Sequence, residues 1–480
     1  MKFLTIIYFL LLVSLTVMAQ QPMQMDTAKK HPKTNKKSPE KKMDMGDMDM
    51  GDMDMSGMKM GKDSIMKMGM TSQYSRDIPM NRDGSGTSWV PDVTPMYAYM
   101  PNTGKWMTMI HGSFFARYDN QDLFKEGSRG GKQFDVPDWM MAMTQRKIGT
   151  GGLFSINTMF SFDPFLVGPG GYPLLYQTGE SYKGVPLVDI QHPHDLFAEL
   201  SANYTQKIAN DADLSFSFGD PGEPALGPPV FMHRLSAMDD PDAPLVHHYQ
   251  DATHITFGVA TLGLRVSNVK LEGSIFTGRE PDEYRYNFDP MRFDSYSVRL
   301  SYNPTKELAL QLSNGWIKSP EVLEPLQNVD RFTTSAIYTK MLNDDGYIAS
   351  TLVYGQDHFS DNQKTLPSIL FENSLQLHNS AVYMRYEYVV KDGEELNLIY
   401  NADMPNNPNY NINAFTLGTN RILGTVKHTD ITGGIQATLN VSPPGLRTLY
   451  GSDPVGFEVY IRISPSMLKM KKIKGDMMDM

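Results

Sequence analysis

The sequence predicts an all-β fold: a transmembrane antiparallel β-barrel of about 16 strands, with roughly 14 to 18 as the range, preceded by a disordered Met-rich segment. Hydrophobic and polar residues alternate from Lys105 to Ser464 in blocks of roughly ten residues, as in strands with one apolar face. The connections between the blocks alternate between long and short. Long loops on one side and tight turns on the other are typical of outer-membrane barrels, whereas a soluble β-sandwich has no reason to segregate its loops.

Residues 1–19 have the pattern of a signal peptide. Lys2 supplies the positive charge, Phe3–Val17 is apolar, and Val17-Met18-Ala19 is a small-x-small cleavage site. An uncleaved anchor helix is the alternative. After Gln21 no apolar run approaches the ~18 residues that a spanning helix needs, which excludes a multi-span helical membrane protein. We therefore expect an exported chain in the outer membrane of a Gram-negative bacterium.

Composition excludes several other classes of protein. The 480 residues contain no Cys, which rules out a disulfide scaffold, a thiolate zinc site and a Cys nucleophile. The formal net charge is -10 and no basic domain stands out, which argues against a nucleic-acid partner.

Residues 20–80 are expected to form a disordered periplasmic arm. The arm begins with a Lys-rich run and continues, in Met43–Met70, with 11 Met and six Asp in an M-D-M-G-D repeat. It has almost no aromatic or branched aliphatic residues, so it cannot bury enough apolar surface to offset the entropy of ordering. We expect residues 81–104 to be a linker and residues 465–480 to be a tail that again contains Met.

The Met repeat has the chemistry of a soft-metal ligand. Thioethers suit Cu(I) and Ag(I), and Met-x-Met spacing lets a flexible chain place several sulfurs around one ion. The interleaved Asp residues can help to hold Cu(II). The expected ligands are Met43, Met45, Met48, Met50, Met53, Met55, Met58 and Met60. The alternative is a solvated low-complexity linker whose Met content is incidental.

Residues 105–464 are expected to form the barrel. In Ser295–Asn303, Tyr296, Val298 and Leu300 face one way, and the serines and Arg299 between them face the other. The expected strands begin near residues 105, 138, 152, 195, 212, 252, 269, 294, 307, 331, 346, 367, 380, 412, 428 and 455. An even number of strands puts both termini in the periplasm and the long loops outside the cell.

The long loops contain most of the histidines, together with carboxylates such as Glu280. Because these loops share one end of the barrel, their side chains can meet in its mouth and ligate Cu(II) or Zn(II). The candidate ligands are His192, His194, His233, His247, His248 and His254, the last just inside the next strand. A hydrogen-bond network that shapes a constriction is the alternative.

We do not expect an enzyme. An outer-membrane lipase needs a Ser nucleophile and a His base on neighbouring strands. His111 and His254 are candidates for strand positions, but no Ser stands out as their partner, and no catalytic motif is present.

An exported chain with a Met/Asp/Gly repeat followed by a barrel resembles the copper resistance protein B family of outer-membrane proteins. The resemblance lies in Met43–Met70 and in the architecture, and the repeat of this chain contains no His. The barrel motifs HPHD (His192–Asp195), HHYQDATH (His247–His254) and GREPDE (Gly278–Glu283) look instead like those of an uncharacterised group of exported barrels.

The resemblance implies a role in copper or silver binding, tolerance or export. The expected partners are outer-membrane lipid, metal ions and periplasmic copper-handling proteins, and the expected cofactor is a copper ion, Cu(I) first and Cu(II) second. A general or substrate-specific porin with an incidental tail is the rival interpretation, and a structural or adhesive barrel is a third.

Overall fold

The computed structural model describes residues 70–398 and 407–468. The chain divides into two compact units, residues 1–65 and 66–480, and all the described residues belong to the second. The predicted signal peptide, the metal ligands Met43 to Met60 and the tail beyond residue 468 lie outside the described residues. No helix of the described part of the chain is long and apolar enough to cross a membrane.

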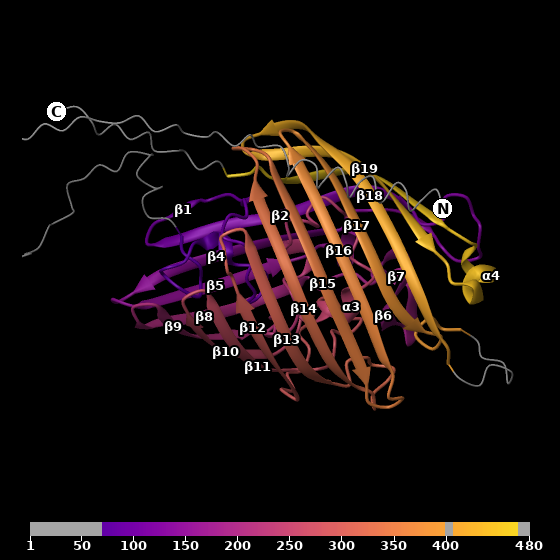
Figure 1. Ribbon diagram of the computed structural model, residues 1–480, viewed down its shortest axis with the longest axis horizontal. Helices are drawn as coiled ribbons and strands as arrows, with labels where there is room; N and C mark the ends of the chain where they lie inside the picture. The colour runs from indigo at the N-terminus through magenta and orange to yellow at the C-terminus, as the bar shows by residue number, and fades with distance from the viewer. Residues whose placement is uncertain (1–69, 399–406, 469–480) are drawn as a thin grey trace, which may run out of the picture. The chain divides into compact units, whose positions relative to one another are not determined.

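Sixteen antiparallel strands form a closed barrel, as the sequence predicts (Figure 1). They are β2 (Trp106–Asn120), β4 (Asp138–Ile148), β5 (Gly152–Phe160), β8 (Phe197–Ala209), β9 (Ala212–Gly219), β10 (Val259–Val266), β11 (Val269–Phe276), β12 (Ser295–Tyr302), β13 (Leu308–Lys318), β14 (Asn328–Met341), β15 (Tyr347–Phe359), β16 (Thr365–Leu377), β17 (Ser380–Asp392), β18 (Asn409–Val426), β19 (Thr429–Val441) and β20 (Val455–Pro465). The barrel closes where β20 pairs with β2, for example at Ile463 and Phe114.

Short elements complete the chain. Two short strands, β1 (Asn102–Thr103) and β3 (Lys132–Asp135), pair with β2. A separate hairpin, β6 (Tyr172–Tyr182) and β7 (Val185–Gln191), lies between β5 and β8. The helical turns are η2 (Met80–Arg82), α2 (Asp163–Leu166), η3 (Phe231–His233), α3 (His247–Gln250), η4 (Ala252–His254), η5 (Pro444–Leu446) and α4 (Arg447–Tyr450).

The two ends of the barrel differ as the loop lengths predict. Tight turns join β4 to β5, β8 to β9, β10 to β11 and the later pairs up to β18 and β19. The intervening connections are longer and include residues 161–196, 220–258 and 277–294. Because β2 begins and β20 ends beside the tight turns, both ends of the barrel lie at this short-turn end.

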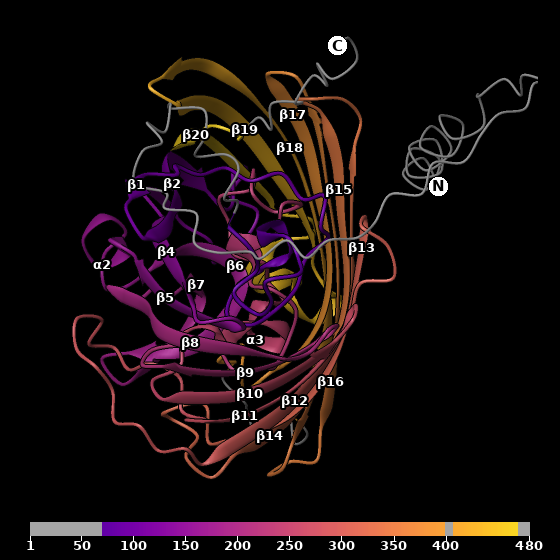
Figure 2. The ribbon, with the colours of Figure 1, turned by 90° about the vertical axis from the view of Figure 1, so that its left-hand side faces the viewer.

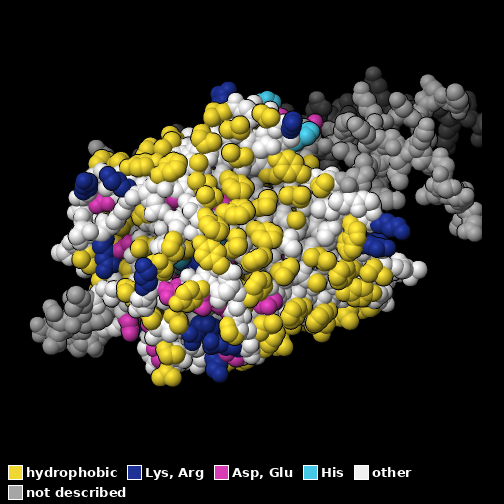
Figure 3. Space-filling model, turned by 180° about the vertical axis from the view of Figure 1, so that it is seen from behind, with side chains coloured by type: hydrophobic (Ala, Val, Ile, Leu, Met, Phe, Trp, Pro, Cys, Tyr) yellow, Lys and Arg dark blue, Asp and Glu magenta, His cyan; other side chains and the backbone are white. Residues whose placement is uncertain are grey.

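Alternation along each strand sorts its side chains between lipid and lumen. In β12, Val298 is 52% exposed on the outer surface, whereas Ser297 is 2% exposed and faces inward. Hydrophobic side chains spread over the face seen in Figure 3, and most of the charged ones lie toward its margins. An apolar outer surface around a polar interior is the arrangement of a transmembrane barrel.

Two chain segments fill the lumen. One, which we name the plug, is residues 70–98, and it enters from the short-turn end. The other, which we name the lumen loop, is residues 220–258 between β9 and β10, and almost all of it is buried. Figure 2 shows α3 of the lumen loop and the neighbouring β6 within the ring of strands.

The plug differs from the expected arm and linker. Tyr74, Trp89 and Val90 are buried, and the plug is hydrogen-bonded to the wall through Gln73. Residues 70–80 are therefore packed rather than disordered, and residues 81–98 are not a linker. The physical reason is that a barrel of 16 strands leaves an interior that the side chains of its wall alone do not fill.

The start of β10 also differs from the expectation. The sequence suggests a strand from about residue 252, but β10 begins at Val259, and residues 252–254 form η4 within the lumen. His254 consequently belongs to the lumen loop and not to a strand. The other expected starts lie within about three residues of the observed ones.

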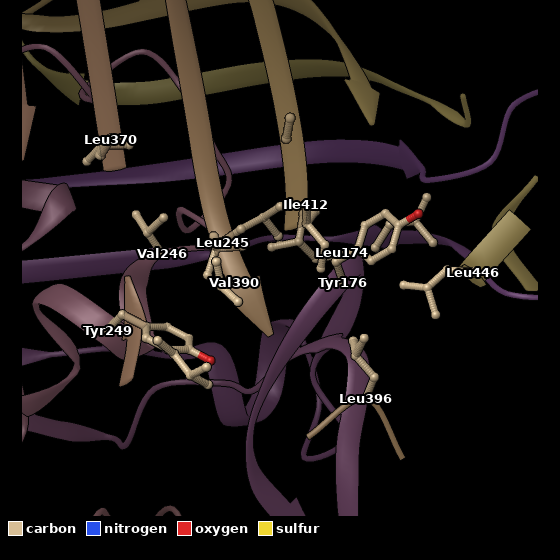
Figure 4. Packing of buried hydrophobic residues seen from close by; sticks show 14 of the residues in the cluster. Leu174, Tyr176, Leu245, Val246, Tyr249, Leu370, Val390, Leu396, Ile412 and Leu446 are labelled. Carbon is tan, nitrogen blue, oxygen red and sulfur yellow. The ribbon is translucent and has the colours of Figure 1, made fainter. Parts of the chain in front are cut away.

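An apolar core fixes the lumen loop to the wall near the long-loop end. Figure 4 shows Leu245 and Val246 of the lumen loop among Leu370, Val390 and Ile412 of the wall strands. Leu174 and Tyr176 of β6 belong to the same core. Burying these side chains together favours the inward fold of the loop, at about 25 cal/mol for each Å² of apolar surface removed from water.

Candidate functional site

Four charged residues of the lumen loop bind the wall of the barrel. Arg234 contacts Glu372 of β16 at 2.9 Å, and Asp239 contacts Arg462 of β20 at 2.7 Å. The remaining pairs are Asp240 with Arg385 of β17 at 3.0 Å and Asp242 with Arg117 of β2 at 2.6 Å. All these side chains are buried. The pairs therefore hold the loop across the interior to four separate strands.

The plug is bound to the opposite part of the wall. The backbone oxygen of Gln73 accepts hydrogen bonds from Asn203 and Thr205 of β8, both at 2.8 Å. The ammonium group of Lys270 in β11 lies 4.1 Å from the ring centre of Tyr74 and 4.9 Å from that of Trp89. These polar and cation–π contacts fix the plug without any covalent link to the strands that it touches.

The plug and the lumen loop meet in the middle of the barrel. The Ser85 hydroxyl of the plug accepts a hydrogen bond from the backbone N–H of Val230 in the lumen loop at 2.8 Å. Beside this junction lies a cavity of about 120 Å³. It is bounded by the plug, the lumen loop, β2 and β4, so neither segment can move without changing it.

Methionine and histidine side chains line this cavity, which we name the Met/His cavity. Its lining includes Met80, Met96, Met109, Met143, Met232, Met238, His111 and His233. The rings of His111 and His233 are 5.4 Å apart, and Trp139 packs against both. Nε2 of His111 has no hydrogen-bond partner. Burial lowers the pKa of His233 to about 3, and His111 adds to this effect, so the imidazole is neutral and able to ligate a metal.

Five of the six predicted loop histidines lie together near the mouth. Their rings contact one another in the order His192, His248, His247, His254 and His194, with successive centres 5.1–5.5 Å apart. The sixth, His233, belongs instead to the Met/His cavity. The structure therefore brings five of the six candidate ligands together and places His233 elsewhere, and metal binding by these residues stays a prediction.

The last three histidines of this row, His247, His254 and His194, share one hydrogen-bonding pattern. Nδ1 of His194 contacts Asp163 at 2.8 Å, Nδ1 of His247 contacts Asp251 at 2.5 Å, and Nδ1 of His254 contacts the backbone oxygen of Asp251 at 3.1 Å. Each Nε2 is buried without a partner. In a neutral imidazole, an acceptor at Nδ1 favours the tautomer in which Nε2 carries a free lone pair.

Carboxylates that were not among the predicted ligands also lie at the mouth. Glu180 of β6 pairs with Arg285 and lies 3.2 Å from Nδ1 of His192. Burial raises the pKa of Glu180 to about 8, although Arg285 opposes this shift. Burial also raises the pKa of Glu321 well above its usual range, with Glu280 and Glu180 adding to the effect. Carboxyl groups are thus crowded beside His192 and His248, and burial and mutual repulsion favour the protonated form of Glu180 and Glu321.

Sequence reasoning missed His111 as a cavity residue and missed Glu180 and Glu321 altogether. His111 occupies an inward position of β2, and strand alternation alone identifies that position. Glu180 and Glu321 come from different long loops, and nothing in the sequence shows that these two loops meet. The prediction that the chain is not an enzyme stays a prediction.

No family model matches this chain, and no curated protein sequence matches it. Solved outer-membrane proteins resemble it in three dimensions. A loop-deletion mutant of OmpT from Vibrio cholerae is 9% identical, with a TM-score of 0.43 over 75% of this chain and 100% of the other. OmpF of Salmonella typhi, in complex with daunomycin, is 11% identical with a TM-score of 0.45 over 76% and 100%.

A third similar structure is an anion-selective porin from Comamonas acidovorans, 10% identical with a TM-score of 0.41 over 75% of this chain and 99% of the porin. Similarities this distant carry no argument about the solute or the mechanism of this chain.

Proposed function

We propose that this chain is an outer-membrane channel protein of porin-like architecture in which the lumen loop limits passage. The observation that carries the proposal is the inward fold of residues 220–258, which four buried ion pairs fix to the wall. An inserted loop narrows the interior of a wide barrel and lines it with charge. This arrangement suits the passage of small polar or charged solutes.

The plug supports the same function. Within residues 70–398 and 407–468, the plug is joined covalently to the barrel only through the residues just before β2, and its contacts with the wall are non-covalent. It can therefore move out of the lumen without breaking the pairing of any two wall strands.

Channel activity is testable by conductance in a planar lipid bilayer. The Ser236 and Thr351 hydroxyls are 2.7 Å apart, between the lumen loop and β15. Because the chain has no Cys, Ser236→Cys with Thr351→Cys introduces a single candidate disulfide. Because the lumen loop and the plug together fill the lumen, passage requires the loop to move aside. We expect the wild type to show discrete conductance steps, and we expect the oxidised double variant, whose loop cannot leave its position, to lose most of them and to regain them on reduction.

The matched control is the single variant Ser236→Cys, whose conductance should not depend on the redox state. The structural barrel would be the better interpretation if the wild-type protein inserted into the bilayer without conducting and if oxidation of the double variant changed nothing.

Soft-metal handling is the second candidate function, and the Met/His cavity is the observation that favours it. Thioether sulfurs and neutral imidazoles are the ligands that Cu(I) and Ag(I) prefer. The cavity lies between the plug and the wall, and the plug follows directly on the Met-rich sequence of residues 43–68. We propose that copper or silver ions captured by Met43 to Met60 are passed to this cavity.

Ag(I) binding to the purified mature protein tests this second function. Met109→Leu with Met143→Leu should remove at least one bound ion per chain, because both side chains line the cavity. Leu conserves the volume of Met, at a cost below about 1.5 kcal/mol. Met384→Leu on the outer surface is the control and should change nothing. Replacing the eight arm methionines with Leu should remove several further ions, and unaltered uptake in both variants would remove the hypothesis.

A further inference from the structure

Three long loops bring one imidazole and two carboxylates together at the mouth. His248 belongs to α3 of the lumen loop, Glu280 to the connection between β11 and β12, and Glu321 to the connection between β13 and β14. One ligand atom from each of the three lies within 4.8 Å of the others. Nδ1 of His248 is 3.8 Å from Oε1 of Glu280, which is too long for a hydrogen bond.

Contacts outside the cluster hold the two carboxylates close to each other. The backbone N–H of Glu280 donates to the oxygen of Pro320 at 3.1 Å, and Arg279 donates to the backbone oxygen of Ser319 at 2.7 Å. On the other side, the backbone N–H of Glu180 donates to Oε2 of Glu321 at 3.1 Å. The carboxylates are therefore positioned by backbone groups and by neighbouring side chains.

Space for the imidazole is provided by a glycine. Gly179 of β6 has a φ of +111°, and a Cβ at this position would lie 2.3 Å from the His248 ring. Only glycine combines this backbone conformation with so close an approach of the ring. The fold thus keeps His248 beside Glu280 and Glu321.

These groups have unmet bonding capacity. His248 is 8% exposed, and both of its ring nitrogens lack a hydrogen-bond partner, as does Oε2 of Glu280. Among the described residues, no Lys or Arg forms an ion pair with Glu280 or Glu321, whereas Arg285 pairs with Glu180 and Arg331 pairs with Asp357. Glu280 and Glu321 are partly buried. A partly buried carboxylate without a paired cation is costly, and a bound cation removes that cost.

We propose that His248, Glu280 and Glu321 form a binding site for a divalent transition-metal ion of the Zn(II) type. Imidazole nitrogen and carboxylate oxygen are both ligands of Zn(II), and three protein ligands leave the fourth tetrahedral position for water. A cavity of about 380 Å³ borders Glu280 and Glu321 and gives an ion access. The bound ion would link the lumen loop to two wall connections and so stabilise the inward position of the loop.

Zn(II) titration of the purified, refolded full mature chain tests this site. We expect one Zn(II) per chain to be lost, or its affinity to fall at least tenfold, in Glu280→Gln, Glu321→Gln and His248→Ala. The control is Glu394→Gln, which removes an exposed carboxylate at the same end of the barrel and should leave binding unchanged. X-ray absorption of the bound zinc should show imidazole together with carboxylate oxygen.

A second measurement separates a metal site from a purely structural cluster. Without metal, both Gln variants should unfold at the same urea concentration as the wild type or a higher one, because they relieve repulsion between carboxylates. With Zn(II), only the wild type and Glu394→Gln should be stabilised. Zinc binding that survives both Gln substitutions, or metal-free Gln variants that are clearly less stable than the wild type, would overturn the proposal. Neither result bears on channel conductance or on Ag(I) uptake.

Discussion

Asp239 illustrates how a single carboxylate holds the lumen loop. It accepts hydrogen bonds from Arg462 at 2.7 Å, Asn420 at 2.8 Å and Ser374 at 2.9 Å, which come from three different strands. Its side chain is fully buried. Inside a barrel a charge of this kind has no access to bulk water, so it stabilises the fold only while its hydrogen-bond and ion-pair partners are present.

We predict that Asp239→Asn lowers the free energy of unfolding by roughly 3–5 kcal/mol, because it leaves the charge of Arg462 buried and unpaired. Urea unfolding of the refolded protein, followed by the heat-modifiable shift on gels, measures this change. Asp361→Asn, in the exposed connection after β15, is the control and should change stability by less than about 0.5 kcal/mol. Equal effects of the two substitutions would contradict the conclusion that Asp239 holds the lumen loop to the wall.

His233 gives the stability a specific dependence on pH. Burial lowers its pKa to about 3 in the folded protein, and the free imidazole has its ordinary value of about 6.5. Between these two values the unfolded chain takes up a proton that the folded chain does not. Protonation therefore favours unfolding, and the contribution of this residue to stability is lost as the pH falls below about 6.5.

We predict that His233→Phe removes this dependence while keeping the aromatic contact with Trp139. Relative to the variant, the wild type should lose up to about 1.4 kcal/mol per pH unit as the pH falls from about 6 towards 4. Urea midpoints of both proteins at several pH values provide the measurement. A difference between them that is the same at every pH would show that His233 titrates normally.

At the scale of the element, β12 shows the two environments of one strand. From the sequence alone, Val298→Arg is expected to destabilise the protein strongly and Ser297→Arg far less, because the side chain at position 297 faces the lumen. In the structure Ser297 lies beside Gly315, against which Leu226 of the lumen loop packs. A large side chain at position 297 therefore overfills the lumen, and the expected difference between the two faces becomes smaller.

We predict that Val298→Arg destabilises the barrel in lipid by roughly 2–4 kcal/mol if the site is near the midplane, because the charge then faces hydrocarbon. Folding in liposomes at graded urea concentrations measures the effect. Val298→Leu is the matched control and should be nearly neutral. If the Arg variant were as stable as the Leu variant, this face of β12 would not contact lipid.

At the scale of the whole molecule, the lumen loop changes which sites can be reached from outside. A long loop between β9 and β10 suggests from its sequence that a protease cuts near Arg234 and that a tag at Glu223 is accessible. Both residues are buried inside the barrel. We now expect that neither a protease nor an antibody reaches these residues on intact cells. Sites that are accessible from outside must lie in other connections.

We predict that an epitope tag at Asn362, in the exposed connection between β15 and β16, is labelled on intact cells. A tag at Asn343, in a short turn, should be labelled only after the outer membrane is permeabilised, because the short turns face the periplasm. Antibody labelling before and after permeabilisation makes the comparison. The opposite pattern would place the Met-rich arm outside the cell and remove periplasmic capture of copper.

The sequence by itself determined the wall of the barrel. Strand alternation is a local pattern with a period of two, so it predicts which residues face lipid, where most strands begin and which connections are long. It also places the histidines of separate long loops at one end of the barrel, where they can meet, since that follows from the topology alone. The Met repeat gives a chemical hypothesis that depends on composition and spacing and not on the fold.

The tertiary structure alone decided what fills the barrel. Nothing in residues 70–98 shows that they return into the lumen, because their polar groups are satisfied by strands such as β8 and β11 that lie far away in the sequence. The pairing of Asp239 with Arg462, the Met/His cavity and the meeting of His248 with Glu280 and Glu321 likewise join residues from separate parts of the chain. Such contacts depend on which segments share the enclosed volume, and a pattern read along the chain contains no information about that volume.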